Sequence, residues 1–139
     1  MVQQQGIVKG DVLQRLGSAG FIVGAILLVV FNALFPRTGD PSNTQEVLTK
    51  WADREVLTQL CALLLAVGTW GVMIGVMGVY RSISTGGGAA WARLGFYGVV
   101  VATTLWTVNF ALVLATAGAA ANWVAAPAAG QATAYSVAA

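Results

Sequence analysis

The stretch "GTWGVMIGVMG", residues 68–78, lies inside a long run without charge and carries Gly68, Gly71, Gly75 and Gly78. A glycine inside a helix costs about 0.5–1 kcal/mol relative to alanine, so four of them need a physical reason. Their spacing averages 3.5 residues, which places all four on one face of a helix. A bare face of this kind lets the backbone of another helix approach closely, which is how helices associate in lipid.

The composition supports a lipid environment. The chain has 139 residues, of which 58% are hydrophobic and only 9% charged, and its mean hydropathy is +0.77. Soluble domains carry about 25% charged residues. A soluble chain this short could not bury so much apolar surface in one core. The sequence therefore predicts an integral membrane protein rather than an apolar soluble domain.

Three uncharged runs are long enough to span a bilayer: residues 16–35, 56–80 and 94–117. A helix rises about 1.5 Å per residue, so ~20 residues cross a ~30 Å hydrocarbon core. The alternation of apolar and polar residues that a barrel requires is absent. The first run exceeds a typical signal-peptide core and has no cleavage site after it. We predict an all-α integral membrane helical bundle with these three transmembrane helices.

Small residues recur at the same spacing in each predicted span. The first span carries Gly17, Gly20 and Gly24, the second the four glycines quoted above, and the third Gly95, Gly98 and Ala102. One interpretation is that these helix-packing stripes hold the three helices to one another. The other is that one stripe faces a different subunit or a flat cofactor.

The most polar part of the chain, residues 36–55, is predicted to be an external loop. Asn43 followed by Glu46 has the pattern of a capping box, with Ser42 and Gln45 as a competing register. A short amphipathic helix over 44–54 is expected, with its apolar residues on the membrane surface or on a neighbour. The acidic residues of the loop are interpreted as a solvated face rather than a metal site.

The remaining segments complete a single membrane domain over residues 1–139. Four cations (Lys9, Arg15, Arg81, Arg93) lie on one side and three (Arg37, Lys50, Arg54) on the other. This bias favours a cytoplasmic amino-terminal arm over 1–15 in a multi-pass protein of the cell inner membrane. The uncharged segment 118–139, interrupted at Pro127 and Gly130, is expected to be an external tail that packs on the bundle or on a partner. It also fits a chain that stops at the start of a further helix.

Aromatic and polar residues mark further candidate sites. Four rings near span ends are predicted to anchor the chain at the headgroup level: Trp51, Tyr80, Trp91 and Trp123. The deeper indoles of Trp70 and Trp106 need hydrogen-bond partners. The spans also contain Asn32, Gln59 and Asn109. These are predicted to form an intramembrane polar cluster, with a binding site for a lipid or quinone headgroup as the alternative.

Reactive chemistry is scarce in this sequence. It has no histidine, Cys61 is its single cysteine, and no charged residue lies inside the three runs. We therefore expect no catalysis, no metal site and no cofactor ligated by this chain. Peripheral contact with lipid, quinone or pigment is compatible with the composition, and nucleic acid is not an expected partner.

Residues 32–81, "NALFPRTGDPSNTQEVLTKWADREVLTQL…GVYRSI", place a polar loop after the first helix and an arginine at the end of the second. This arrangement resembles uncharacterised bacterial multi-spanning membrane proteins. The resemblance implies a helical bundle, with a fourth helix that this sequence lacks, and implies no activity.

These observations predict a small accessory subunit without catalysis, packed against larger partners in a membrane complex. The host would be an energy-converting assembly, respiratory or photosynthetic. One alternative is a homo-oligomeric channel or transporter component lined by threonine and asparagine. Another is a stand-alone membrane protein of lipid or stress physiology.

Overall fold

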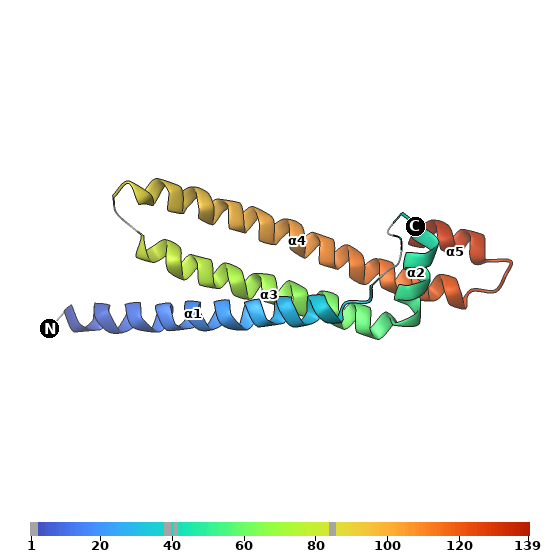
Figure 1. The fold of residues 1–139 in the computed structure, drawn as a ribbon, viewed down its shortest axis with the longest axis horizontal. Coiled ribbons are helices and arrows are strands. Elements are labelled where there is room, and N and C mark those ends of the chain that lie inside the picture. The colour runs from blue at the N-terminus through green and yellow to red at the C-terminus, as the bar shows by residue number, and fades with distance from the viewer. Residues whose placement is uncertain (1–2, 38–39, 41, 84–85) are drawn as a thin grey trace. The chain divides into compact units, whose positions relative to one another are not determined.

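The computed structural model describes residues 3–37, 40, 42–83 and 86–139, with side chains from Arg15 onward. Over this part of the chain every regular element is a helix (Figure 1). The elements are α1 (Gln3–Leu34), α2 (Thr44–Asp53), α3 (Glu55–Ser82), α4 (Gly88–Ala125) and α5 (Gln131–Ala138). The predicted all-α class is therefore confirmed.

Three of these helices are long and apolar enough to cross a membrane: α1 over Arg15–Leu34, α3 and α4. They correspond to the three spans predicted from uncharged runs. The structure thus agrees with a membrane-embedded bundle of three spanning helices. The short helix α2 also lies where it was predicted, within one residue of its expected end.

The long helices extend further than the predicted spans. Helix α1 begins at Gln3, so most of the predicted arm over 1–15 is helical. Helix α4 begins six residues before the predicted start at 94 and ends eight residues after 117. Charged residues define where an apolar run ends, but they do not interrupt helical hydrogen bonds, because long basic side chains can reach the headgroups from inside a helix. The alanine-rich segment after 117 also favours helix.

The contacts of the chain group into two compact units. The first contains Met1–Val29 and Ala66–Thr107, and the second contains Val30–Leu65 and Val108–Ala139. The division falls inside α1, α3 and α4.

In the first unit, α1 packs against α3, and α3 packs against α4. The chain reverses between α3 and α4 at Gly86, whose φ of 82° lies in the region that favours glycine. Helix α4 begins two residues later, at Gly88. Near this turn the rings of Tyr80 and Phe96 stack with centroids 4.9 Å apart.

The second unit has a small core formed by α2, α5 and the end of α4. Leu48, Ala120 and Ala138 are buried together, and Trp123 and Tyr135 pack against them. The segment 118–139 is helical on both sides of its predicted interruption. It continues α4 to Ala125, turns between Pro127 and Gly130, and returns as α5 onto α2 (Figure 1).

Helix α2 begins at the predicted cap. The Asn43 side chain accepts a hydrogen bond from the Glu46 amide at 3.2 Å. The reciprocal half of the predicted capping box is replaced by another contact, because the Glu46 carboxylate pairs with Lys50 Nζ at 2.6 Å one turn further on. The apolar residue Leu48 is buried in the second unit instead of lying on a membrane surface.

Candidate helix-packing surface

The contact between α1 and α3 is a contact of backbones. A β-carbon built at Gly24 would lie 2.6 Å from the Gly68 carbonyl oxygen, and one at Gly71 would lie 2.8 Å from the Gly20 carbonyl oxygen. Real β-carbons do not approach other atoms this closely. The close approach brings carbonyl oxygens near Cα atoms, which permits weak Cα–H···O contacts. Only glycine fits at these two positions.

The same contact becomes looser toward Gly17 and Gly78. A β-carbon at Gly17 would lie 3.4 Å from the Gly78 Cα, which is ordinary van der Waals distance. Between these two regions, Gly75 accommodates the side chain of Phe21, because a β-carbon at Gly75 would collide with the Phe21 Cβ and would lie 2.8 Å from the ring carbon Cδ2. The α1 and α3 stripes therefore face each other within the first unit.

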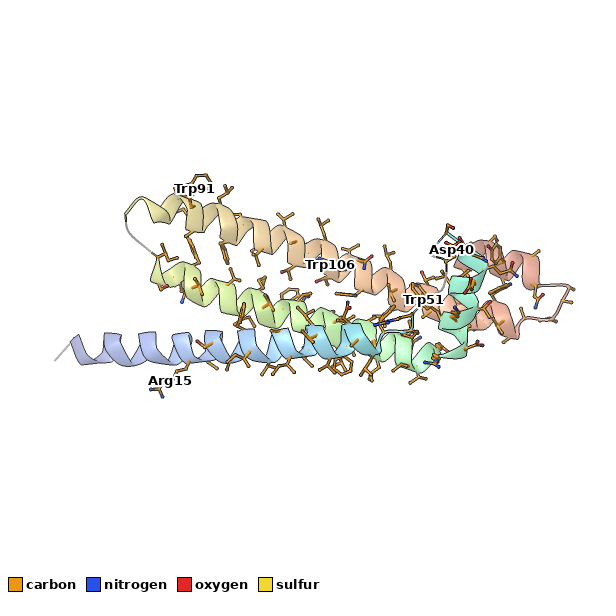
Figure 2. All side chains as sticks on the ribbon, in the orientation of Figure 1. Arg15, Asp40, Trp51, Trp91 and Trp106 are labelled. Atoms are coloured by element: carbon orange, nitrogen blue, oxygen red, sulfur yellow. The ribbon has the colours of Figure 1, made fainter. Side chains whose placement is uncertain are left out.

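The stripe on α4 has a different environment. A β-carbon at Gly95 or at Gly98 would have no atom within 4 Å, and Ala102 is exposed. The surrounding residues are also exposed; Trp91 is 75% exposed and Leu94 is 64% exposed. Figure 2 shows Trp91 pointing away from α3. This stripe therefore makes no packing contact within the described part of the chain.

Helix α4 uses its opposite face to pack against α3. Thr103 is 6% exposed, and the Trp70 indole Nε1–H donates a hydrogen bond to Thr107 Oγ1 at 3.1 Å. Thr107 in turn donates to the Thr103 carbonyl at 2.7 Å. The expectation that Trp70 has a partner in the bundle is confirmed. The α3–α4 contact thus depends on aromatic and hydroxyl side chains, and the small residues of α4 are left outside it.

The predicted polar cluster is not assembled. The Gln59 Nε2–H donates to Glu55 Oε1, one turn earlier on α3, at 2.9 Å. Asn32 and Asn109 are exposed. No hydrogen bond joins any two of these three residues in the second unit as described. The physical reason is local, because the adjacent carboxylate provides Gln59 with a charge-assisted hydrogen bond on its own helix.

The four predicted anchors fall into two groups. Trp51 meets Phe35 edge-on with ring centroids 6.1 Å apart, Trp123 lies 5.2 Å from Tyr135, and Tyr80 stacks on Phe96. These three rings therefore pack against other rings of the same unit. Among the four, Trp91 alone is exposed in the described structure.

One feature is not anticipated by sequence patterns. The second unit contains a cavity of about 570 Å³ whose lining includes Arg37, Lys50 and Arg54. The sequence has three cations, Arg37, Lys50 and Arg54, in the 18-residue segment 37–54 after the first span. This concentration of positive charge is the sequence feature that could have indicated a cavity lined by cations. From the sequence, these residues were used only to predict the orientation of the chain in the membrane.

The reactive groups of the described residues do not converge. No three histidine, cysteine, aspartate or glutamate side chains among them come close enough to hold a metal ion, and Cys61 is a buried free thiol. Comparison of the chain with protein-family models, curated proteins and solved structures found no match. The functional proposal below therefore rests on the geometry of this chain.

Proposed function

We propose that this protein is a small accessory subunit without catalytic activity, which packs against larger, different membrane proteins. The contact surface would be the α4 open face. We define this face by seven exposed residues that lie on one side of α4 within the first unit: Trp91, Leu94, Gly95, Gly98, Val101, Ala102 and Leu105.

The observation that carries the proposal is the unfilled stripe at Gly95 and Gly98. On α1 and α3, the cost of placing glycine in a helix is offset by the close backbone contact that glycine allows. On α4 the same residue type has open space above it. If a helix of a second protein packed here, its backbone could approach closely over these two positions. That contact would offset the cost of placing glycine in α4.

Large exposed side chains lie beside the small residues of the α4 open face. Leu94, Val101 and Leu105 are each more than half exposed, and their spacing places them in a row along one side of the small residues. Such ridges and grooves are the features through which helices interlock. Contacts of this kind require no reactive group, which agrees with a sequence that lacks histidine and carries no charge in its three uncharged runs.

The host that this proposal favours is an energy-converting assembly, respiratory or photosynthetic, in the cell inner membrane. There the chain would border lipid, quinone or pigment without ligating a metal. The amino terminus would lie in the cytoplasm, following the bias of cations toward that side. A cysteine at the exposed position of Gln45, in a Cys61→Ala background, is expected to react with an impermeant maleimide in intact cells. One at Gly87 should react only after permeabilisation.

The association is tested by purification from the native membrane in mild detergent. Larger and different subunits are expected to co-purify in fixed stoichiometry. The double variant Gly95→Leu/Gly98→Leu should lose them while keeping its own helicity, because a β-carbon at either position would meet no atom of a neighbouring described element within 4 Å. Ala111→Leu is the matched control. It adds the same side chain at an exposed site about 140° around α4 from Gly98.

Other results would contradict the proposal. If the double variant co-purifies as well as the control, the α4 open face is not the contact surface. If the chain purifies as a homo-oligomer that conducts solutes in liposomes, it is a channel component. Purification as a lone chain would favour a stand-alone role in the membrane.

A further inference from the structure

The cavity of the second unit lies where α1 ends, α2 ends and α3 begins. Its lining includes Leu34 from α1, Arg37 from the following segment, Lys50 from α2, and Arg54 and Leu57 around the start of α3. The spanning part of α1 ends at Leu34, and α3 begins at Glu55. The cavity therefore lies at the depth where two membrane spans end, which is the level of lipid headgroups.

The charges of the cavity are only partly neutralised within the chain. Lys50 is paired with Glu46. Arg37 and Arg54 are exposed, and their guanidinium groups have no hydrogen bond or ion pair with any residue that the structure describes. Asp53 also lines the cavity and forms no ion pair with these cations in the described structure. Two guanidinium groups thus border one cavity without a bonded anion.

The other wall of the cavity is apolar. Ala33 and Leu34 belong to the end of the first span, and Leu57 lies in the first turn of α3. One cavity therefore presents cations toward the aqueous side and aliphatic carbon toward the hydrocarbon. A ligand that satisfies both walls is an amphiphile with an anionic head and an acyl chain.

We propose that this cavity binds a phosphate-bearing headgroup, with Arg37 and Arg54 as its principal contacts. A guanidinium group presents paired N–H donors that match two oxygens of a phosphate, and it is more weakly hydrated than an ammonium group. A cavity of about 570 Å³ exceeds the size of a free phosphate ion and has the usual volume of an organic ligand site. We assign the phosphate to a glycerophospholipid. Both leaflets contain phosphodiesters, so recognition does not depend on the orientation of the chain.

The test uses the full chain purified in a nonionic detergent. Binding of dioleoylphosphatidylglycerol, of dioleoylglycerol and of inorganic phosphate is measured by native mass spectrometry and by the shift in unfolding temperature. Phosphatidylglycerol should bind, dioleoylglycerol should not because it has the same acyl chains without phosphate, and inorganic phosphate should bind only weakly. Higher sodium chloride should weaken the lipid complex.

Two variants with equal loss of charge separate the site from general electrostatics. Arg37→Gln/Arg54→Gln should raise the Kd for phosphatidylglycerol about 30-fold, from roughly 1 kcal/mol per cation near a membrane surface. Arg81→Gln/Arg93→Gln removes two exposed arginines of the first unit and should change the Kd less than about twofold, because neither residue lines the cavity. Measurement in micelles makes the comparison independent of membrane orientation.

Each outcome decides the proposal. Equal affinity in the Arg37→Gln/Arg54→Gln variant and the wild-type chain, or equal binding of dioleoylglycerol and phosphatidylglycerol, would overturn it. Inorganic phosphate binding as tightly as the lipid, with the same loss in the Arg37→Gln/Arg54→Gln variant, would support the phosphate site and assign it to a free anion. If this variant loses helicity, Arg37→Lys/Arg54→Lys replaces it. That variant keeps both charges, and unchanged lipid affinity in it would overturn the role of the guanidinium pairs.

Discussion

Single glycines differ sharply in what they do, although their spacing in the sequence is the same. Gly24 and Gly71 have backbone atoms of the facing helix where their β-carbons would be, whereas Gly95 and Gly98 have open space. The sequence predicts that the small residues of each helix share a face, because 3.5-residue spacing does so in any helix. It does not predict what that face meets, because this depends on how each helix is rotated about its axis.

Gly24→Ala should destabilise the chain, whereas Gly17→Ala should not. The added methyl at Gly24 meets backbone 2.6 Å away, so the helices must separate, at a cost of about 1–3 kcal/mol. At Gly17 the nearest atom is 3.4 Å away, and the better helix propensity of alanine should leave stability unchanged or raise it by up to ~1 kcal/mol. The measurement is the free energy of unfolding in mixed detergent micelles. Equal effects of the two substitutions would show that the α1–α3 contact is looser than described.

Among the helices, α2 shows which parts of an element a sequence specifies. The Asn43 cap and the helix start are readable because they depend on neighbours within four residues. The ends of α1 and α4 were predicted less well. The predicted ends were placed at charged residues, which end an apolar run but do not end a helix. Arg93, for example, lies inside α4.

Helix α2 also has a charge contact with a predictable response to pH. The hydrogen bond and positive charge of Lys50 lower the pKa of Glu46 below its ordinary 4.5. A carboxylate with a lowered pKa contributes stability above its unfolded pKa, and this contribution is lost as the pH falls through the folded pKa. Lys50→Gln should therefore raise the Glu46 pKa, as followed by carbon NMR of the side-chain carboxyl. An unchanged titration would mean that the 2.6 Å contact is not populated.

A control for this titration is available in the same loop. The pKa of Asp40 is lowered chiefly by the Ser42 hydroxyl and also by the Ser42 amide, both of which donate to its Oδ1. Lys50 is not among these causes. The Asp40 titration should therefore stay where it is in the Lys50→Gln chain, whereas a parallel shift of both groups would indicate a general change in the loop.

At the scale of the whole chain, the least predictable contacts join residues far apart in sequence. Leu48 of α2 and Ala138 of α5 share one buried cluster. The sequence predicts that segment 118–139 is too apolar to remain in water and is broken near Pro127. The sequence does not decide whether this segment packs on the bundle or on another protein. No local sequence pattern predicts that α5 packs against α2. This contact depends on the direction that α5 takes after the turn at Gly130.

Tyr135→Ala, a substitution in α5, should weaken the packing of α2 although it changes no residue of α2. The tyrosine packs against the Leu48 cluster and lies 5.2 Å from the Trp123 ring, and aromatic pairs contribute about 0.5–1.5 kcal/mol beyond area burial. Trypsin should then cleave faster after Lys50 and Arg54. The Val137→Ala variant is the control, because this position is 75% exposed. Trypsin should cleave it at the wild-type rate. Slow cleavage in both variants would place the support of α2 elsewhere.

The crossing of Gly24 and Gly71 has a consequence for how this sequence can change over generations. In most cores a larger residue on one side can be accommodated by a smaller one opposite. Here the atoms in the way belong to the main chain of the facing helix, and no codon makes a main chain smaller. Drift at these two sites therefore has no second-site suppressor within the contact, and a saturation-mutagenesis library should recover them as wild type only.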